Sequence, residues 1–160
     1  MRLVFYYLIL IAFQGFISAL LAPLPAPDLF LLIALSPIRR MKAWQLVLLA
    51  YSVGLLQDLI GHGVFGLHAF AIAAGVFLAL IVKDHFSQGL LSQIIIVLAA
   101  LVGKWLAMLP MIFWLGSSPN TLALIYRVLP YEFVFTIITG IFVLPWAEAL
   151  MQRALLAKEK

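Results

Sequence analysis

The sequence predicts an all-α integral membrane protein, a compact bundle of six transmembrane helices in a single domain that covers residues 1–160. Three observations predict this class. Hydrophobic residues make up 66% of the chain and charged residues 10%, whereas soluble domains are about half apolar and about a quarter charged. The mean hydropathy is +1.19. Long apolar runs alternate with short polar turns, and at about 20 residues per crossing the chain holds six crossings only if its loops are short.

The first apolar run, residues 3–22, is long enough to cross a bilayer. A basic residue precedes the run and an alanine-rich stretch follows it, so the run also fits a secretory signal peptide. We expect it to stay in the mature protein, because its removal would leave an odd number of crossings. The segment from Pro23 to Pro27 ends this helix, since proline lacks an N–H group and restricts the residue before it.

The second helix is expected over residues 28–38 and is short for a crossing. Pro27 and Asp28 suit its start, because proline has the φ angle of a first helical residue and aspartate interacts favourably with the positive end of the helix dipole. A basic turn that contains Arg39, Arg40 and Lys42 follows it.

The remaining helices follow from the apolar runs between turns that are rich in glycine, histidine and polar residues. They are expected over residues 43–60, 64–82, 90–115 and 122–151, with a kink at Pro110. The last run is longer than one crossing needs. We therefore expect residues 122–129 to lie along the outer interface, and the crossing itself to start at Pro130.

The distribution of lysine and arginine predicts the orientation, because the cytoplasmic loops of membrane proteins carry an excess of these residues. If the N-terminus is cytoplasmic, the three loops on the far side, residues 23–27, 61–63 and 116–120, hold no basic residue. The cytoplasmic segments then hold Arg2, Arg39, Arg40, Lys42, Lys83, Arg153, Lys158 and Lys160. This segregation predicts that both termini are cytoplasmic.

Small residues four positions apart predict close helix packing, because helices in lipid associate through close contact of small side chains. Two such series lie in the helices expected over residues 64–82 and 90–115: Ala71, Gly75 and Ala79, and Ala99, Gly103 and Ala107. We expect both helices to pack tightly on their neighbours.

Ionisable residues inside a membrane are costly, so each one is a candidate functional residue. The spacing of Asp58 from Tyr51, Gly54 and Gly61 places these residues on one helix face, which we expect to look into the bundle. Asp28 and Glu132 lie on the outer side, with Arg127 just above Glu132. The candidate residues for intramembrane polar contacts, packing or partner binding are Asp28, Gly54, Asp58, Gly61, Gly66, Lys104, Arg127 and Glu132.

Lys104 falls near the middle of residues 90–115, too deep to reach either surface easily. It must therefore meet a carboxylate, a carbonyl group or water. We expect Lys104 to reach Asp58 or Glu132. Such a pair has three interpretations: it fixes helix packing, it receives a partner, or it belongs to an ion or proton pathway.

Motifs of catalysis, metal binding and phosphate binding are missing from the sequence. The three histidines are too scattered for a zinc site, and neither His62 nor His68 has an obvious reactive partner. The absence of cysteine excludes disulfides and thiol chemistry. Basic residues do not cluster into a patch suited to nucleic acid. We therefore expect a protein that is not an enzyme and that has no cofactor, no metal and no nucleic-acid partner.

Two motifs give the chain a family resemblance. The first is the Pro-Asp-Leu sequence at residues 27–29, which opens the short second helix before the basic turn. The second is Gly54-x-x-x-Asp58-x-x-Gly61, followed by Gly66 and an apolar helix. In these motifs, and in its length and helix number, the chain resembles the family of the rod shape-determining membrane protein MreD of bacteria. A late helix with a glycine and a proline before a basic tail fits less tightly, and Lys104 and residues 117–127 depart from the pattern.

The resemblance implies a non-enzymatic scaffold or regulator of the cell-elongation and peptidoglycan-synthesis complex in the bacterial cytoplasmic membrane. Its direct partner would be the transmembrane segment of MreC. Its indirect partners would be the actin-like MreB, the RodA glycosyltransferase and the partner transpeptidase of RodA, and lipid would surround it.

The same family is similar in architecture to the six-helix substrate-binding subunits of energy-coupling vitamin transporters. The alternative function is therefore a small-molecule-binding subunit of a membrane transporter. That function needs a cavity in the outer half of the bundle, and the residues available to line it include Asp58, Glu132, Tyr131 and His68.

Overall fold

The fold of the chain is all-helical over the residues that the structure, a computed structural model, describes: 26–61, 64–86, 89–115 and 119–156. For the last helix, the described side chains are those of residues 125–146. The described elements are α2 (Leu29–Leu35), α3 (Ala43–Ile60), α4 (Leu67–Lys83), α5 (Leu90–Trp114) and α6 (Pro119–Leu156). The helical class is confirmed, while the helix expected over residues 3–22 lies outside the described residues.

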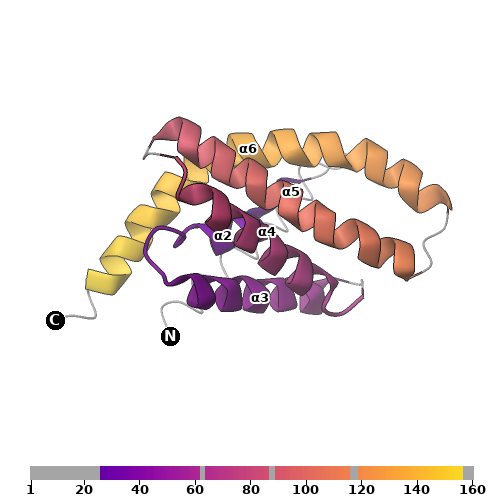
Figure 1. The fold of residues 1–160 in the computed structure, drawn as a ribbon, viewed down its shortest axis with the longest axis horizontal. Helices are drawn as coiled ribbons and strands as arrows, with labels where there is room; N and C mark the ends of the chain where they lie inside the picture. The colour runs from indigo at the N-terminus through magenta and orange to yellow at the C-terminus, as the bar shows by residue number, and fades with distance from the viewer. Residues whose placement is uncertain (1–25, 62–63, 87–88, 116–118, 157–160) are drawn as a thin grey trace.

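The long helices pack in chain order around the short one. Each of α3, α4 and α5 contacts the helix that follows it, and α2 contacts all four long helices (Figure 1). The interface between α4 and α5 is the most extensive, followed by that between α3 and α4. The core of the bundle is therefore built around α2, whose seven residues are all buried.

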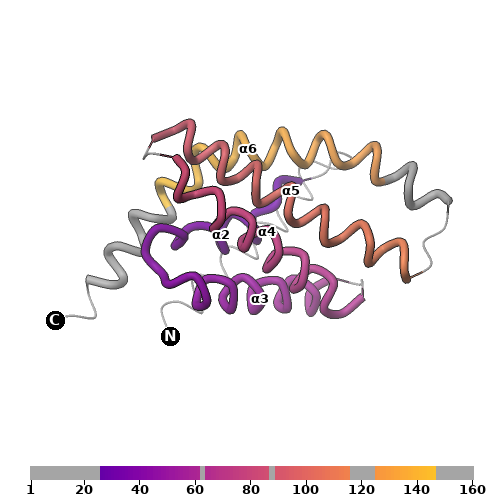
Figure 2. Tube along the Cα trace, viewed as in Figure 1, coloured from indigo at the N-terminus to yellow at the C-terminus, as the bar shows by residue number. Residues whose placement is uncertain are grey.

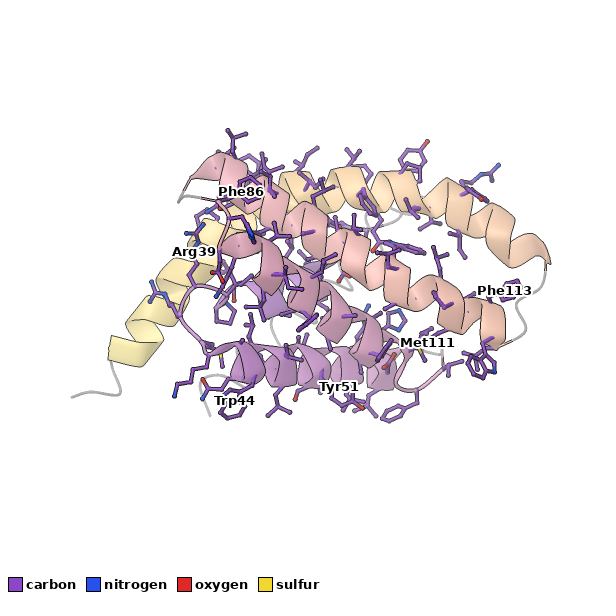
Figure 3. All side chains as sticks on the ribbon, viewed as in Figure 1. Arg39, Trp44, Tyr51, Phe86, Met111 and Phe113 are labelled. Carbon is purple, nitrogen blue, oxygen red and sulfur yellow. The ribbon has the colours of Figure 1, made fainter. Side chains whose placement is uncertain are left out.

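Three described segments are long and apolar enough to cross a membrane: α3, α5 and Ile125–Trp146 of α6. The apolar helix α4 is shorter, with 17 residues. In an apolar stretch of 18 residues within each segment only 28%, 39% and 22% of the residues are buried, and exposed apolar side chains such as Trp44 and Phe113 project from the bundle (Figure 3). Soluble proteins keep exposed apolar patches to a few hundred Å². This surface is that of a membrane protein.

The helix α2 is shorter than the expected range of residues 28–38, because its helical part is only Leu29–Leu35. At 1.5 Å per residue it is about 10 Å long, about a third of the hydrocarbon layer. It therefore does not cross a bilayer by itself. Its burial shows that it serves as a core element between the longer helices.

Polar contacts fix the depth of α2 in the bundle. After α2, Arg39 donates a hydrogen bond to Ser92 in the first turn of α5 at 3.1 Å, and Lys83 Nζ donates to the carbonyl oxygen of Ile38 at 3.2 Å. We call the end of the bundle that carries Arg39, Arg40, Lys42 and Lys83 the basic end. Before α2, Asp28 lies beside Lys104, which is about 18 Å further along α5 than Ser92. The helix therefore fills only the half of the bundle next to the basic end.

Glycine permits the closest helix crossings, as the small-residue spacing predicts for Gly75 and Gly103. A Cβ atom added to Gly54 in α3 would lie 2.3 Å from the Cα atom of Ala69 in α4. One added to Gly75 in α4 would lie 2.5 Å from the carbonyl oxygen of Ala100 in α5. Gly103 takes part in the same α4–α5 contact. Ala100 is also buried, whereas Ala99 and Ala107 of the expected series are half-buried.

The last helix is continuous where the sequence predicts a break. α6 runs from Pro119 to Leu156 with Pro130 inside it. Residues 122–129, which were expected to form an interfacial segment, therefore belong to the same helix as the residues after Pro130. A proline inside a helix removes one hydrogen bond and bends the helix without having to end it. Figure 1 shows α6 as one helix that changes direction towards its C-terminal end, and Pro145 also lies within it; Figure 2 follows the same path over residues 125–146. The start of α4 is later than expected, at Leu67 instead of residue 64.

Candidate functional site

A buried lysine joins three helices in the middle of the bundle. Lys104 Nζ on α5 donates to Asp28 Oδ2 at the start of α2, at 2.6 Å, and to Glu132 Oε1 on α6, at 2.5 Å. All three residues are buried, with exposed fractions of 5% for Lys104, 5% for Asp28 and 8% for Glu132. The expected Lys104–Glu132 pair is therefore present. Asp28, which the sequence only places on the same side, is the second partner.

Asp28 is held from two directions, which explains its orientation. Its Oδ1 atom accepts the backbone N–H of Leu31 at 3.0 Å and so caps α2, while its Oδ2 atom accepts from Lys104. Its own backbone N–H donates to Thr136 Oγ1 on α6 at 2.9 Å. Since Thr136 lies four residues after Glu132, both face the same neighbour. These bonds hold α2 between α5 and α6.

Asp58 forms a separate site and does not contact Lys104, so that expected pair is wrong. Its carboxylate accepts the backbone N–H groups of Gly66 at 2.9 Å, His68 at 3.1 Å and Ala69 at 3.1 Å. The first amides of a helix lack partners within the helix, and an aspartate near them satisfies these donors. Asp58, near the end of α3, therefore caps the start of α4 across the α3–α4 turn.

His68 is also bound by Asp58, although the sequence suggests no partner for it. Its Nδ1 atom lies 2.8 Å from Asp58 Oδ1. An ionised carboxylate only accepts hydrogen bonds, so Nδ1 carries the proton. In the neutral ring the other nitrogen, Nε2, is then an acceptor. The side chain is 26% exposed and lies at the edge of a cavity.

The contacts of Lys104 with Asp28 and Glu132 form what we call the lysine network. A cavity with a volume of about 270 Å³ lies beside it. Its polar lining residues are Asp28, Gln57, His68, Lys104, Trp105 and Glu132, and its apolar ones are Ala26, Met108 and Val128. Because α2 begins only at the depth of Lys104, no residue of this helix fills the space beyond Asp28. The cavity is thus a consequence of the shortness of α2.

Other candidate residues lie outside this site. Tyr51 is 43% exposed and Gly61 is also exposed, so of the four residues expected on the inward face of α3 only Gly54 and Asp58 are buried. Arg127 is exposed and lies outside the lysine network. Tyr131 is 47% exposed and does not line the cavity. Gly66 has a φ angle of +93°, a conformation that favours glycine, at the residue before α4.

Three residues of the site were not identified from the sequence: Gln57, Trp105 and Thr136. Gln57 and Trp105 directly adjoin Asp58 and Lys104 in sequence, and Thr136 lies one helical turn after Glu132. Proximity to an intramembrane charge was therefore the available signal. It could not be used alone, because neighbours in a helix point in different directions and the rotation of each helix depends on its packing.

The fold and site define a helical membrane protein with a buried charge network and an adjacent polar cavity. Among the described residues, no group of three or more histidine or acidic side chains is placed to hold a metal ion. In comparisons with known proteins, no family model, no curated protein and no solved structure matches the chain.

Proposed function

We propose that the protein is a non-enzymatic scaffold or regulator of the bacterial cell-elongation complex, of the MreD type, in the cytoplasmic membrane. The proposal includes six crossings with both termini in the cytoplasm, the second of them made by α2 together with the residues on either side of it. The carrying observation is the Asp28–Lys104–Glu132 network, because Lys104 binds both carboxylates inside the protein and so ties α2 to α5 and α6. Because these charges hold helices together, they support a protein that acts as a scaffold.

The residues behind the family resemblance support the same role. Asp28, from the first motif, caps α2 and binds Lys104. In the second motif, Gly54 allows α3 to touch α4, Asp58 caps α4, and Gly66 adopts the positive φ angle that precedes α4. Each of these four residues positions one helix against another, which is what a rigid docking platform requires.

The partner in this proposal is the single transmembrane segment of MreC. The exterior offered to it is apolar along its length, with Leu48 on α3, Leu106 on α5 and Phe142 on α6 exposed by 58%, 62% and 73%. Helices associate in lipid through van der Waals packing, so a partner helix needs a fixed, complementary surface and no buried charge of its own.

The test is site-specific photo-crosslinking in the membrane of a rod-shaped bacterium whose own MreD has been deleted. A photoreactive amino acid is placed at residue 48, 106 or 142, one helix face at a time, and tagged MreC is co-expressed. We expect a crosslink to MreC from one face and restored rod shape. A buried position in α3, Leu46, is the matched control because it is 0% exposed.

Two results would contradict the proposal. One is the absence of an MreC crosslink from every exposed face while the protein is folded in the membrane. The other is rod shape that is not restored by the unmodified chain although the chain and MreC are both present.

The cavity is the one feature that favours the alternative, a small-molecule-binding subunit of a transporter. Its volume of about 270 Å³ lies just below the range of about 300–1,000 Å³ that is typical of ligand pockets. A vitamin-sized substrate is therefore a poor fit, and the scaffold remains our proposal.

A further inference from the structure

Two polar atoms beside the cavity are buried and have no hydrogen-bond partner within the described part of the chain. They are the indole Nε1 of Trp105 and the side-chain carbonyl oxygen Oε1 of Gln57. Both residues line the cavity, and Trp105 is only 7% exposed. Buried polar groups are nearly always paired, because an unpaired one loses its hydrogen bonds to water without compensation. Because neither atom is exposed, a small rotation of each side chain towards the cavity is what brings this donor and this acceptor to a bound molecule.

The charges of the lining are unequal. Asp28 and Glu132 contribute two carboxylates, and Lys104 contributes one ammonium group that donates to both. Asp58 adds no demand for a cation here, since its carboxylate accepts four N–H donors at the start of α4. In a membrane interior this excess of negative charge and acceptors favours a monovalent cation with N–H donors.

The size and the apolar part of the lining limit the ligand further. A volume of about 270 Å³ admits a small molecule, and Met108 and Val128 offer contact to a few carbon atoms. The Trp105 N–H needs an oxygen acceptor on the same molecule.

We propose that this cavity binds a small organic ammonium ion that carries an oxygen atom, of the amino-alcohol type. The ammonium group donates to Glu132 and to Gln57 Oε1, and the oxygen accepts the indole N–H of Trp105. The lysine network forms the floor of the site and is not displaced. This site is independent of the scaffold proposal, because it depends on the cavity and not on any protein partner.

Two sources carry this chemistry: a free amino alcohol, and the ethanolamine headgroup of a phospholipid. The experiment separates them. The full-length protein, purified in detergent, is heated with ethanolamine, with ethylene glycol as the neutral analogue, or with glycolate as the anionic one. Parallel samples contain short-chain phosphatidylethanolamine or phosphatidylglycerol. Unfolding is followed by tryptophan fluorescence, and affinity is measured by calorimetry.

We expect a concentration-dependent rise in the melting temperature with an ammonium probe, because a ligand that binds only the folded state stabilises it by mass action. Ethylene glycol, glycolate and phosphatidylglycerol should cause no comparable rise. A response to free ethanolamine identifies a soluble amine as sufficient. A response to phosphatidylethanolamine alone identifies the lipid headgroup.

Substitutions at Trp105 and Gln57 test whether the ligand binds through the two unpaired atoms. Trp105→Phe removes the N–H donor and keeps an aromatic ring, and Gln57→Leu removes the acceptor with little change of shape. Each should weaken ethanolamine or phosphatidylethanolamine binding roughly three- to tenfold, the loss of about one hydrogen bond. Trp114→Phe, on the same helix and 90% exposed, is the matched control and should bind like the unaltered protein. Because Gln57 lies on α3, its variant still tests the site if the Trp105 variant does not fold.

The inference is overturned if no ammonium probe raises the melting temperature up to millimolar concentrations, or if ethylene glycol binds as well as ethanolamine. Equal binding by the unaltered protein and both site variants would overturn it too. Crosslinking to MreC is unaffected by each of these outcomes, so failure of this site and failure of the scaffold proposal are distinguishable.

Discussion

Asp28 and Lys104 lie 76 positions apart in the sequence and meet at 2.6 Å in the middle of the bundle. The contact joins the first turn of the shortest helix to the centre of α5. It sets the depth at which α2 begins, and so determines both which half of the interior α2 fills and where the cavity is left.

Removal of the Lys104 charge should destabilise the protein strongly. Lys104→Met leaves two buried carboxylates without their shared cation, and breaking a buried ion pair in this way costs about 3–5 kcal/mol. Glu132→Gln should cost less, because the Asp28–Lys104 pair remains. The measurement is the free energy of unfolding in detergent, followed by tryptophan fluorescence.

The triple variant Asp28→Asn, Lys104→Met, Glu132→Gln has no charge in the network. It should recover much of the stability that Lys104→Met loses, because no carboxylate is then left unpaired. Arg127→Gln, at an exposed residue, serves as the control and should change stability by no more than about 0.5 kcal/mol. A triple variant no more stable than Lys104→Met would show that the network does not act as a unit.

Alanine at Gly54 should separate α3 from α4. The new Cβ atom would lie 2.3 Å from the Cα atom of Ala69, a backbone atom that can move only with its helix. Overpacking of this kind costs about 1–3 kcal/mol, which a lowered melting temperature would reveal. Gly89→Ala is the matched control, since no atom lies within 4 Å of its added Cβ and its effect should stay below about 1 kcal/mol. Equal effects at both glycines would contradict the tight crossing.

Asp58→Ala should loosen the start of α4, because three backbone N–H groups lose their acceptor. We expect a loss of about 2 kcal/mol or more, at the upper end of single-cap effects. Hydrogen–deuterium exchange should become faster at Gly66, His68 and Ala69 in particular. Ser52→Ala, also on α3, removes an exposed hydroxyl group and should leave this exchange unchanged. Unchanged protection of the three amides in Asp58→Ala would contradict the capping role.

The orientation can be tested with single cysteines, because the chain contains none of its own. Lys42 lies at the basic end before α3, and Trp114 at the other end of the bundle is 90% exposed. In intact cells a membrane-impermeant maleimide should label Trp114→Cys, and should label Lys42→Cys only after the membrane is opened. The reason is that the proposed topology places the basic end in the cytoplasm, where the loops of membrane proteins carry an excess of lysine and arginine. Labelling of both positions from outside would contradict the proposed topology.

Several elements could be predicted from the sequence because their signals are local. The bounds of α3 are as expected, and α5 ends one residue earlier than expected, since apolar runs between turn residues mark them directly. Gly75 and Gly103 indicate close crossings through their spacing, and Gly54 lies on the face of α3 that was expected to look into the bundle. Two expectations differ from the structure: Pro130 lies inside a continuous helix and does not end one, and the helix after Asp28 is shorter than the apolar run that predicts it.

The sequence by itself determined that this is a helical membrane protein and that a lysine as deep as Lys104 needs a carboxylate, because both follow from composition and from the cost of charge in lipid. Only the tertiary structure decided that the carboxylates are Asp28 and Glu132, and that Asp58 binds the start of α4 instead. The reason is physical: a helix pattern gives the side chains on each face, but the partner of a face depends on the depth and rotation of neighbouring helices. The unpaired polar atoms of Trp105 and Gln57 were also decided only by the tertiary structure, since a cavity exists only once the surrounding helices are in place.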